Sequence, residues 1–127
     1  MNDIRAAIRE VLVDGRLPCA RAFAVAGKMG VKPIDVGNVA TEEEIKISHC
    51  QLGLFGYLQG ERPVERMKDQ VTDELRLAVT GHLVDGQLPC VVAWQIASEL
   101  KVPKMHVSAA AEELNIRIRA CQLGCFA

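Results

Sequence analysis

Aromatic residues and long hydrophobic runs are both scarce in this chain of 127 residues. Aromatic side chains make up 4% of the sequence while hydrophobic residues make up 50%, so Ala, Val, Ile and Leu must supply most of the core. No apolar run approaches the roughly 18 residues that a transmembrane helix needs. The N-terminal stretch mixes charged and apolar side chains, unlike a secretory signal peptide. We therefore expect a cytoplasmic protein that makes no membrane contact.

Neither sign of charge predominates. The chain has 15 Lys and Arg residues against 16 Asp and Glu residues, which gives a formal net charge of −1 and no general attraction to nucleic acid. Motifs of common catalytic sites are also missing, including the glycine-rich nucleotide loops, the G-x-S-x-G nucleophile motif and the H-E-x-x-H zinc motif. We therefore expect that the protein is not an enzyme.

An internal duplication is the strongest signal in the sequence. Residues 2–56 align with residues 73–127 at an offset of 71 positions without a gap, and 22 of the 55 aligned positions are identical. Unrelated segments of this length and of ordinary composition would share about 3 or 4 identical positions. Two blocks stand out, LVDGRLPC aligned with LVDGQLPC and CQLGLF aligned with CQLGCF. We therefore predict a first repeat over 1–56, a connector over 57–72 and a second repeat over 73–127.

Each repeat predicts the same succession of short elements. Apolar residues at helical spacing predict a first helix that ends at Asp-Gly, because glycine readily adopts the left-handed conformation that ends helices. A proline then begins the second helix. After the third helix, isoleucines alternate with other residues, which predicts a short strand. The predicted bounds of the second and third helices are 18–29 and 33–43 in the first repeat and 89–100 and 104–114 in the second.

The connector predicts a loop followed by a helix. Residues 56–60 contain two glycines, and Pro63 then begins a pattern of apolar residues spaced three and four apart that runs to Leu83. Such spacing predicts one continuous helix of roughly 20 residues, which would join the connector to the first helix of the second repeat.

The second and third helices of each repeat resemble the helix-turn-helix motif of DNA-binding proteins. With Ala22 as the first position of that motif, Val25 and Ala26 occupy its buried fourth and fifth positions, and Gly30 occupies its turn. The second repeat has Lys101 at the turn position, where a left-handed backbone costs energy. The following strand makes each repeat similar to the winged-helix variety. The resemblance implies a mainly α fold with short β-strands, in which two winged-helix-like repeats pack as one pseudo-symmetric unit.

In this family the third helix contacts bases in the major groove. The resemblance therefore implies double-stranded DNA as a partner, with lysines at phosphates and an asparagine at an adenine edge. Against this, an acidic run follows the third helix of the first repeat, and neither contacting face contains an arginine. A scaffold for protein contacts therefore stays open as an alternative. The candidate nucleic-acid-binding residues are Lys32, Asn38 and Thr41 in the first repeat and Lys104 and Ser108 in the second.

Four of the five cysteines recur between the repeats. Cys19 and Cys90 follow the proline that begins the second helix, whereas Cys50 and Cys121 lie in the predicted strand, and Cys125 occurs in the second repeat alone. Cysteine is commonly a small buried apolar residue, so core packing explains these positions most simply. The alternative is that these five residues form a redox site, or bind zinc or an iron–sulfur cluster.

Together these features predict a non-enzymatic tandem winged-helix-like module, which acts as a DNA-binding transcriptional regulator or adaptor and needs no cofactor. Its apolar content favours a homo-oligomer. The alternative function is a protein-interaction domain whose repeated cysteines sense the redox state or bind a metal or an iron–sulfur cluster. In that case the partner is another protein.

Overall fold

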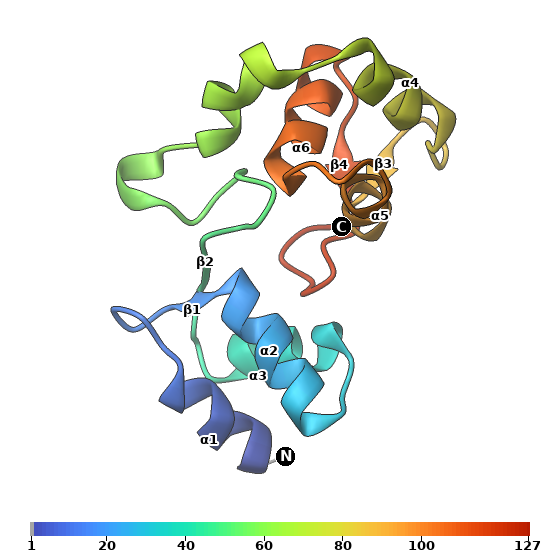
Figure 1. Ribbon diagram of the computed structural model, residues 1–127. Helices are drawn as coiled ribbons and strands as arrows, with labels where there is room; N and C mark the ends of the chain where they lie inside the picture. The colour runs from blue at the N-terminus through green and yellow to red at the C-terminus, as the bar shows by residue number, and fades with distance from the viewer. Residues whose placement is uncertain (1) are drawn as a thin grey trace. The chain divides into compact units, whose positions relative to one another are not determined.

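The computed structural model describes residues 2–127 and shows a mainly helical chain with short strands, as the sequence predicts (Figure 1). The first repeat contains α1 (Asn2–Glu10), β1 (Leu17–Pro18), α2 (Cys19–Met29), α3 (Pro33–Glu42) and β2 (Ile47–Ser48). The connector contains two 3-10 helices, η1 (Leu58–Gly60) and η2 (Pro63–Gln70). The second repeat contains α4 (Asp73–Gly81), β3 (Leu88–Pro89), α5 (Cys90–Leu100), α6 (Lys104–Glu113) and β4 (Ile118–Arg119).

The chain divides into two compact units, and each contains a short segment of the other repeat. Unit 1 comprises residues 2–50, 55–61 and 122–125, and unit 2 comprises residues 51–54, 62–121 and 126–127. The two exchanged segments, 51–54 and 122–125, differ in number by the same offset of 71 that relates the repeats. Each unit is therefore built from the helices of one repeat, part of the connector and four residues of the other repeat. The packing of both repeats as one pseudo-symmetric unit stays a prediction.

A tight turn precedes the second helix in both repeats. Asp14 and Gly15 have φ values of 51° and 75°, and the equivalent Asp85 and Gly86 have φ values of 52° and 76°. Positive φ at both central residues is typical of the type I′ turn, for which Asp-Gly is a preferred pair. The flanking residues form an isolated antiparallel bridge in each repeat. The Asp-Gly pair therefore makes a hairpin turn between the first and second helices. The prediction that it ends the first helix is wrong, because α1 ends at Glu10 and α4 at Gly81.

The short strand after the third helix is confirmed, but its partner is not a wing strand. β2 pairs in parallel with β1, which lies between the first and second helices, and β4 pairs in the same way with β3. Among residues 2–127 no further strand pairs with β2 or β4. Neither unit therefore shows a winged-helix arrangement, in which a hairpin would return the chain beside this strand.

The turn between the second and third helices follows the predicted pattern. Gly30 (φ 67°, ψ 31°) ends α2, and Lys101 (φ 57°, ψ 45°) ends α5, both in the left-handed conformation. The backbone therefore adopts the same cap with a lysine in place of glycine, despite the cost that a Cβ imposes there. The small residues predicted to pack between the helices are buried, namely Ala22, Ala26, Ala93 and Ala97.

The continuous helix predicted through the connector does not form. η2 ends at Gln70, Val71 is extended with a ψ of 126°, and α4 begins after Thr72. The hydroxyl oxygen of Thr72 accepts a hydrogen bond from the amide of Leu75 at 3.2 Å, so Thr72 caps the N-terminus of α4. The prediction is wrong because the apolar spacing continues through this cap while the helical backbone does not.

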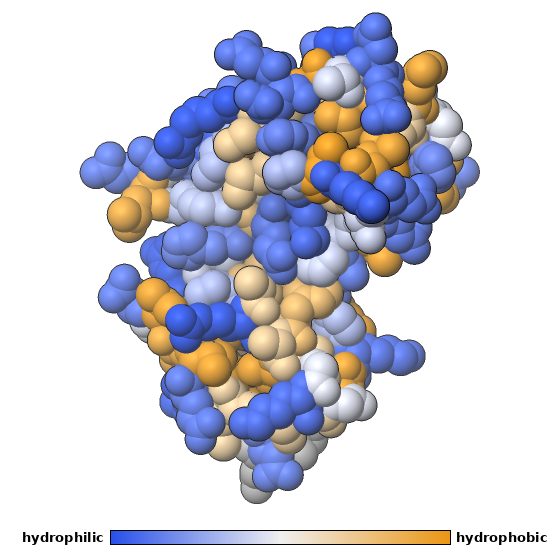
Figure 2. Space-filling view, in the orientation of Figure 1, coloured by the Kyte–Doolittle hydropathy of each residue, from blue (hydrophilic) through white to orange (hydrophobic). Residues whose placement is uncertain are grey.

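Hydrophilic residues cover most of the face shown in Figure 2, and hydrophobic residues emerge between them in separate patches. The exposed large hydrophobic side chains are Ile34, Leu58, Leu77, Val84 and Val91. Of these, Ile34 alone belongs to a third helix. None of the helices formed by residues 2–127 has the length and apolar character needed to cross a membrane.

Candidate functional site

Each repeat ends in a loop of sequence C-Q-L-G-x-F, and an equivalent hydrogen bond closes both loops. The amide of Cys50 donates to the carbonyl of Phe55 at 3.2 Å, and the amide of Cys121 donates to the carbonyl of Phe126 at 3.1 Å. The loop glycines have φ values of 75° and 82°, which glycine adopts without strain. The two loops therefore share their backbone turn. We call Gln51–Leu54 and Gln122–Cys125 the loop tips.

In unit 1 the second tip lies against α3. Leu123 is buried, and its carbonyl oxygen lies so close to Gly37 that a Cβ at position 37 would meet it at 1.8 Å. The next residue of the tip, Gly124, lies beside the side chain of Ile34. The contact therefore depends on a residue without a side chain in the middle of α3.

In unit 2 the first tip lies against α6 at the equivalent position. Leu52 is buried, and the hydroxyl of Ser108 donates a hydrogen bond to its carbonyl oxygen at 2.5 Å. Ser108 is the counterpart of Gly37 at the offset of 71, and Leu52 is the counterpart of Leu123. The same tip carbonyl thus meets the same helix position in both units.

A second layer covers the tip in unit 2. Figure 1 shows η2 beside α6, and Val64 at the start of η2 is fully buried. Arg62 forms an ion pair with Glu112 of α6, and its Nε donates to the carbonyl of Leu54 in the tip at 3.2 Å. The hydrogen bond to Glu112 is the main reason that the pKa of Arg62 is raised. The connector thereby joins both the tip and the third helix of unit 2.

The predicted nucleic-acid-binding residues differ in environment between the units. Lys32, Asn38 and Thr41 are exposed in unit 1, and the Thr41 hydroxyl donates to the carbonyl of residue 37 at 3.0 Å. In unit 2 the ammonium group of Lys104 lies 4.6 Å from the centroid of the Trp94 ring. Ser108 is completely buried beneath the tip. The third helix of unit 2 is therefore covered on the face that would contact bases.

Ion pairs link the first helix to the end of the third helix in each unit. In unit 1, Arg9 donates a hydrogen bond to Glu43 at 2.7 Å, and Arg5 lies 3.6 Å from the same carboxylate. In unit 2, Arg76 donates to both oxygens of Glu113 at 2.5 and 2.9 Å. These hydrogen bonds are the main reason that the pKa values of both carboxyl groups are lowered.

The four repeated cysteines lie just beyond the ends of the paired strands. Cys19 directly follows β1 and Cys50 closely follows its partner β2, and Cys90 and Cys121 have the same relation to β3 and β4. Cys19, Cys50 and Cys90 are buried, Cys121 is half-buried and Cys125 is exposed. Within residues 2–127, no three or more His, Cys, Asp or Glu side chains are grouped to hold a metal ion.

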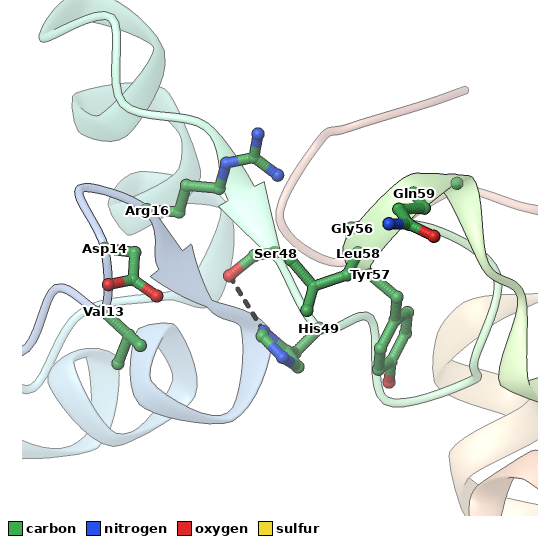
Figure 3. Close-up of a pocket in the computed structure, with 10 residues that line it drawn as sticks. Val13, Asp14, Arg16, Ser48, His49, Gly56, Tyr57, Leu58 and Gln59 are labelled. Carbon is green, nitrogen blue, oxygen red and sulfur yellow. Dashed lines mark hydrogen bonds between the residues drawn. The ribbon is translucent and has the colours of Figure 1, made fainter.

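Unit 1 also contains a cavity of about 440 Å³ beside residues 56–60 (Figure 3). The ring of His49 lies edge-on to Tyr57 with centroids 5.0 Å apart, and its Nδ1 lies 3.2 Å from the Ser48 hydroxyl. Tyr57 donates to the carbonyl of Cys50 at 2.7 Å. Partial burial raises the pKa of Tyr57, and the nearby thiols of Cys50 and Cys19 raise it further. Asp14 and Arg16 also line this cavity.

Apart from Cys125, a candidate redox or metal residue, the residues of the loop tips were not among those predicted as a site from the sequence. The available signal was the identity of C-Q-L-G in both repeats, because a short strand alone does not require four identical residues. Glycine at position 37 was a second signal, since glycine inside a helix is unfavourable by about 0.5–1 kcal/mol unless close packing requires it.

The chain has no match among protein-family models, curated proteins or solved structures. Its function must therefore be inferred from its own residues.

Proposed function

We propose that this protein is a non-enzymatic protein-interaction module in which the third helix of each unit binds short peptide segments. One observation carries the proposal: each third helix holds a loop tip at an equivalent backbone carbonyl, that of Leu123 in unit 1 and that of Leu52 in unit 2. Contacts to a peptide backbone supply affinity with little dependence on side chains, and pockets beside them supply selectivity. Ser108 of α6 makes such a backbone contact, and a groove lined in part by Thr41 of α3 offers such a pocket.

DNA binding by unit 1 is the competing proposal. Lys32, Asn38 and Thr41 are exposed, as a helix that contacts DNA requires. However, α3 also carries Asp35 and Glu42, and carboxylates repel the phosphate backbone. The helix contains no arginine, which makes the commonest specific base contacts. These features favour a protein partner over double-stranded DNA.

A tip peptide added in trans tests the proposal. The probe is a synthetic peptide of residues 48–57, and the receptor is the full chain carrying Leu52→Ala, which weakens its own tip. We expect saturable changes in the NMR chemical shifts of the α6 amides. The matched control peptide carries aspartate in place of Leu52 and should cause no such changes. Failure of the unaltered peptide to shift these amides at about 1 mM, which corresponds to a binding free energy near −4 kcal/mol, would overturn the proposal.

A titration with random duplex DNA separates the two proposals. Ordinary nonspecific binding has a dissociation constant of about 10⁻⁴ to 10⁻⁶ M at physiological salt and is tighter at low salt. We expect the unmodified chain to show no binding below roughly 100 μM at low salt. Binding in that range that is weakened by Lys32→Ala, but not by Lys68→Ala in η2, would instead favour a DNA-binding regulator.

Redox sensing by the cysteines is a second candidate function, because Cys19 and Cys50 each lie within two residues of the paired strands β1 and β2. In the proposed step, hydrogen peroxide oxidises the thiols of Cys19 and Cys50: each sulfur loses a hydrogen, an S–S bond forms, and the peroxide is reduced to two molecules of water. The equivalent step in unit 2 joins Cys90 and Cys121. Mild peroxide treatment should lower the intact mass by two hydrogen atoms per pair, and Cys19→Ser should abolish the loss in unit 1. A mass that only rises, by added oxygen, contradicts this function.

A further inference from the structure

In unit 2 a short segment lies over both the tip and the helix beneath it. Arg62 bonds to Glu112 of α6 and to the carbonyl of Leu54 in the tip. Val64 is fully buried, and its amide donates to another tip carbonyl at 3.3 Å. We call residues 62–64 the cover segment. Its sequence, Arg-Pro-Val, combines a cation, a proline that begins a 3-10 helix and an aliphatic side chain.

The corresponding surface of unit 1 is exposed. At the offset of 71, the α3 counterparts of Met105, Ala109 and Glu112 are Ile34, Asn38 and Thr41. All three residues on α3 are exposed, Ile34 to 37%. The tip residues Gly124 and Cys125 are exposed as well. Their five counterparts in unit 2 are buried or half-buried. Within residues 2–127, the surface formed by third helix and tip is therefore covered in unit 2 and open in unit 1.

A groove of about 510 Å³ lies in unit 1 where Arg62 would be expected by analogy with unit 2. Thr41 and Cys125 line this groove. At the offset of 71, these residues are the counterparts of Glu112 and Leu54, which both bind Arg62. The groove therefore coincides with the position of the cation in the cover segment.

The lining of the groove suits a segment that carries a cation and apolar side chains. In unit 1, Thr41 stands at the position of Glu112 and has no carboxylate, but Glu44 of the groove lining supplies one. Ile45, Ile47 and Phe55 supply apolar surface, and Lys46 completes the lining. A carboxylate at the edge of an apolar wall can pair with a guanidinium group while its aliphatic stem contacts the wall.

We propose that this groove binds a segment of a partner protein that has the chemistry of the cover segment, a basic residue followed by proline and an aliphatic residue. The inference rests on the proposed function, because it names a peptide that one third helix binds in addition to its tip. The basic side chain enters the groove toward Glu44, and the aliphatic side chain contacts Ile34. Asn38 stands where unit 2 has Ala109, and its amide can bond to the backbone of the bound segment.

A synthetic peptide of residues 60–70, which contains the cover segment, is the probe. We expect it to bind the unmodified full chain with a dissociation constant below about 1 mM and to shift the NMR signals of Ile34, Asn38, Thr41 and Gly124. Thr41→Arg should weaken binding at least tenfold because the new side chain occupies the groove. The matched control is Thr80→Arg in α4, since Thr80 is also exposed and also donates its hydroxyl to the carbonyl four residues earlier. This control should bind like the unmodified chain.

A second variant places the change in the peptide, so that folding of the protein is not affected. Aspartate in place of Val64 in the peptide should also weaken binding at least tenfold. Absence of binding at 1 mM, or binding that Thr41→Arg does not weaken, would overturn the inference. If the tip peptide binds α6 while this peptide does not bind, the inference alone fails. If neither peptide binds, the proposed function fails with it.

Discussion

Unit 1 and unit 2 place the same loop tip on the same helix, but they use different chemistry. In unit 1 the carbonyl of Leu123 approaches α3 because Gly37 has no side chain. In unit 2 a hydroxyl stands at that position, and Ser108 donates a hydrogen bond to the carbonyl of Leu52. The tips keep three of four residues identical, whereas this helix position changes. Between the two repeats, the tip sequence therefore differs less than the residue of the third helix that contacts it.

The largest expected effect comes from removing the leucine of either tip. Leu52 and Leu123 are almost fully buried, so replacing either by alanine should lower the free energy of unfolding by about 2–5 kcal/mol. Hydrogen exchange should locate the loss in the unit that holds the tip. Leu52→Ala should reduce protection of α6, and Leu123→Ala should reduce protection of α3. If Leu52→Ala instead affects α3 alone, the exchange of tips is disproved.

A smaller effect is expected when a side chain is added at the close contact of unit 1. Gly37→Ala places a Cβ against the carbonyl of Leu123, and such overpacking typically costs about 1–3 kcal/mol. The matched control is Gly27→Ala in α2, where a Cβ meets nothing within 4 Å. The control should stabilise the helix by about 0.5–1 kcal/mol. Urea unfolding measures both, and equal effects in the two variants would contradict the tight contact.

The hydrogen bond from Ser108 to Leu52 should contribute less to the free energy of unfolding than the buried side chain of Leu52 does. Ser108→Ala leaves the carbonyl of Leu52 without its hydroxyl donor, and the expected loss is about 1 kcal/mol. Ser98→Ala in α5 is the control, because Ser98 is exposed. An unchanged midpoint of urea unfolding in Ser108→Ala would show that the tip does not depend on this hydroxyl.

The smallest effect concerns the ion pairs that both units share. The folded-state pKa values of Glu43 and Glu113 lie below the usual value near 4.3. Their contribution to stability is therefore present above about pH 4.3 and is lost as the pH falls through the lower folded-state values. Both pairs are exposed, so the contribution is small. Thermal unfolding from pH 6 to pH 2 should show a shallower acid decline in Arg9→Ala than in the unmodified chain. The exposed Arg117→Ala should leave that decline unchanged.

Local elements were predictable because local sequence determines them. The predicted helices at 18–29 and 33–43 agree with α2 and α3 to within one residue at each end. The left-handed turn at Lys101 followed from the alignment with Gly30. Helical spacing alone failed in the connector, because it cannot detect the cap at Thr72 that separates η2 from α4.

The loop tips could not be placed from the sequence because their contacts join residues that are far apart in the chain. Leu52 meets Ser108, which lies 56 residues later. Neither tip contains a residue that specifies which third helix it contacts, since both read Gln-Leu-Gly. Only the packed structure distinguishes a tip that stays with its own repeat from one that joins the other. The strand pairing could not be predicted for a related reason, since the partner of β2 is β1, 30 residues earlier, and not a following wing strand.

A chain with a single repeat would have a third helix but no second repeat to supply its tip. Two such chains would need to associate in order to exchange tips, and their stability would depend on protein concentration. Joining the repeats through residues 57–72 makes the exchange intramolecular, and a short linker provides an effective concentration of about millimolar. The covalent connection thereby makes the exchange of tips independent of protein concentration.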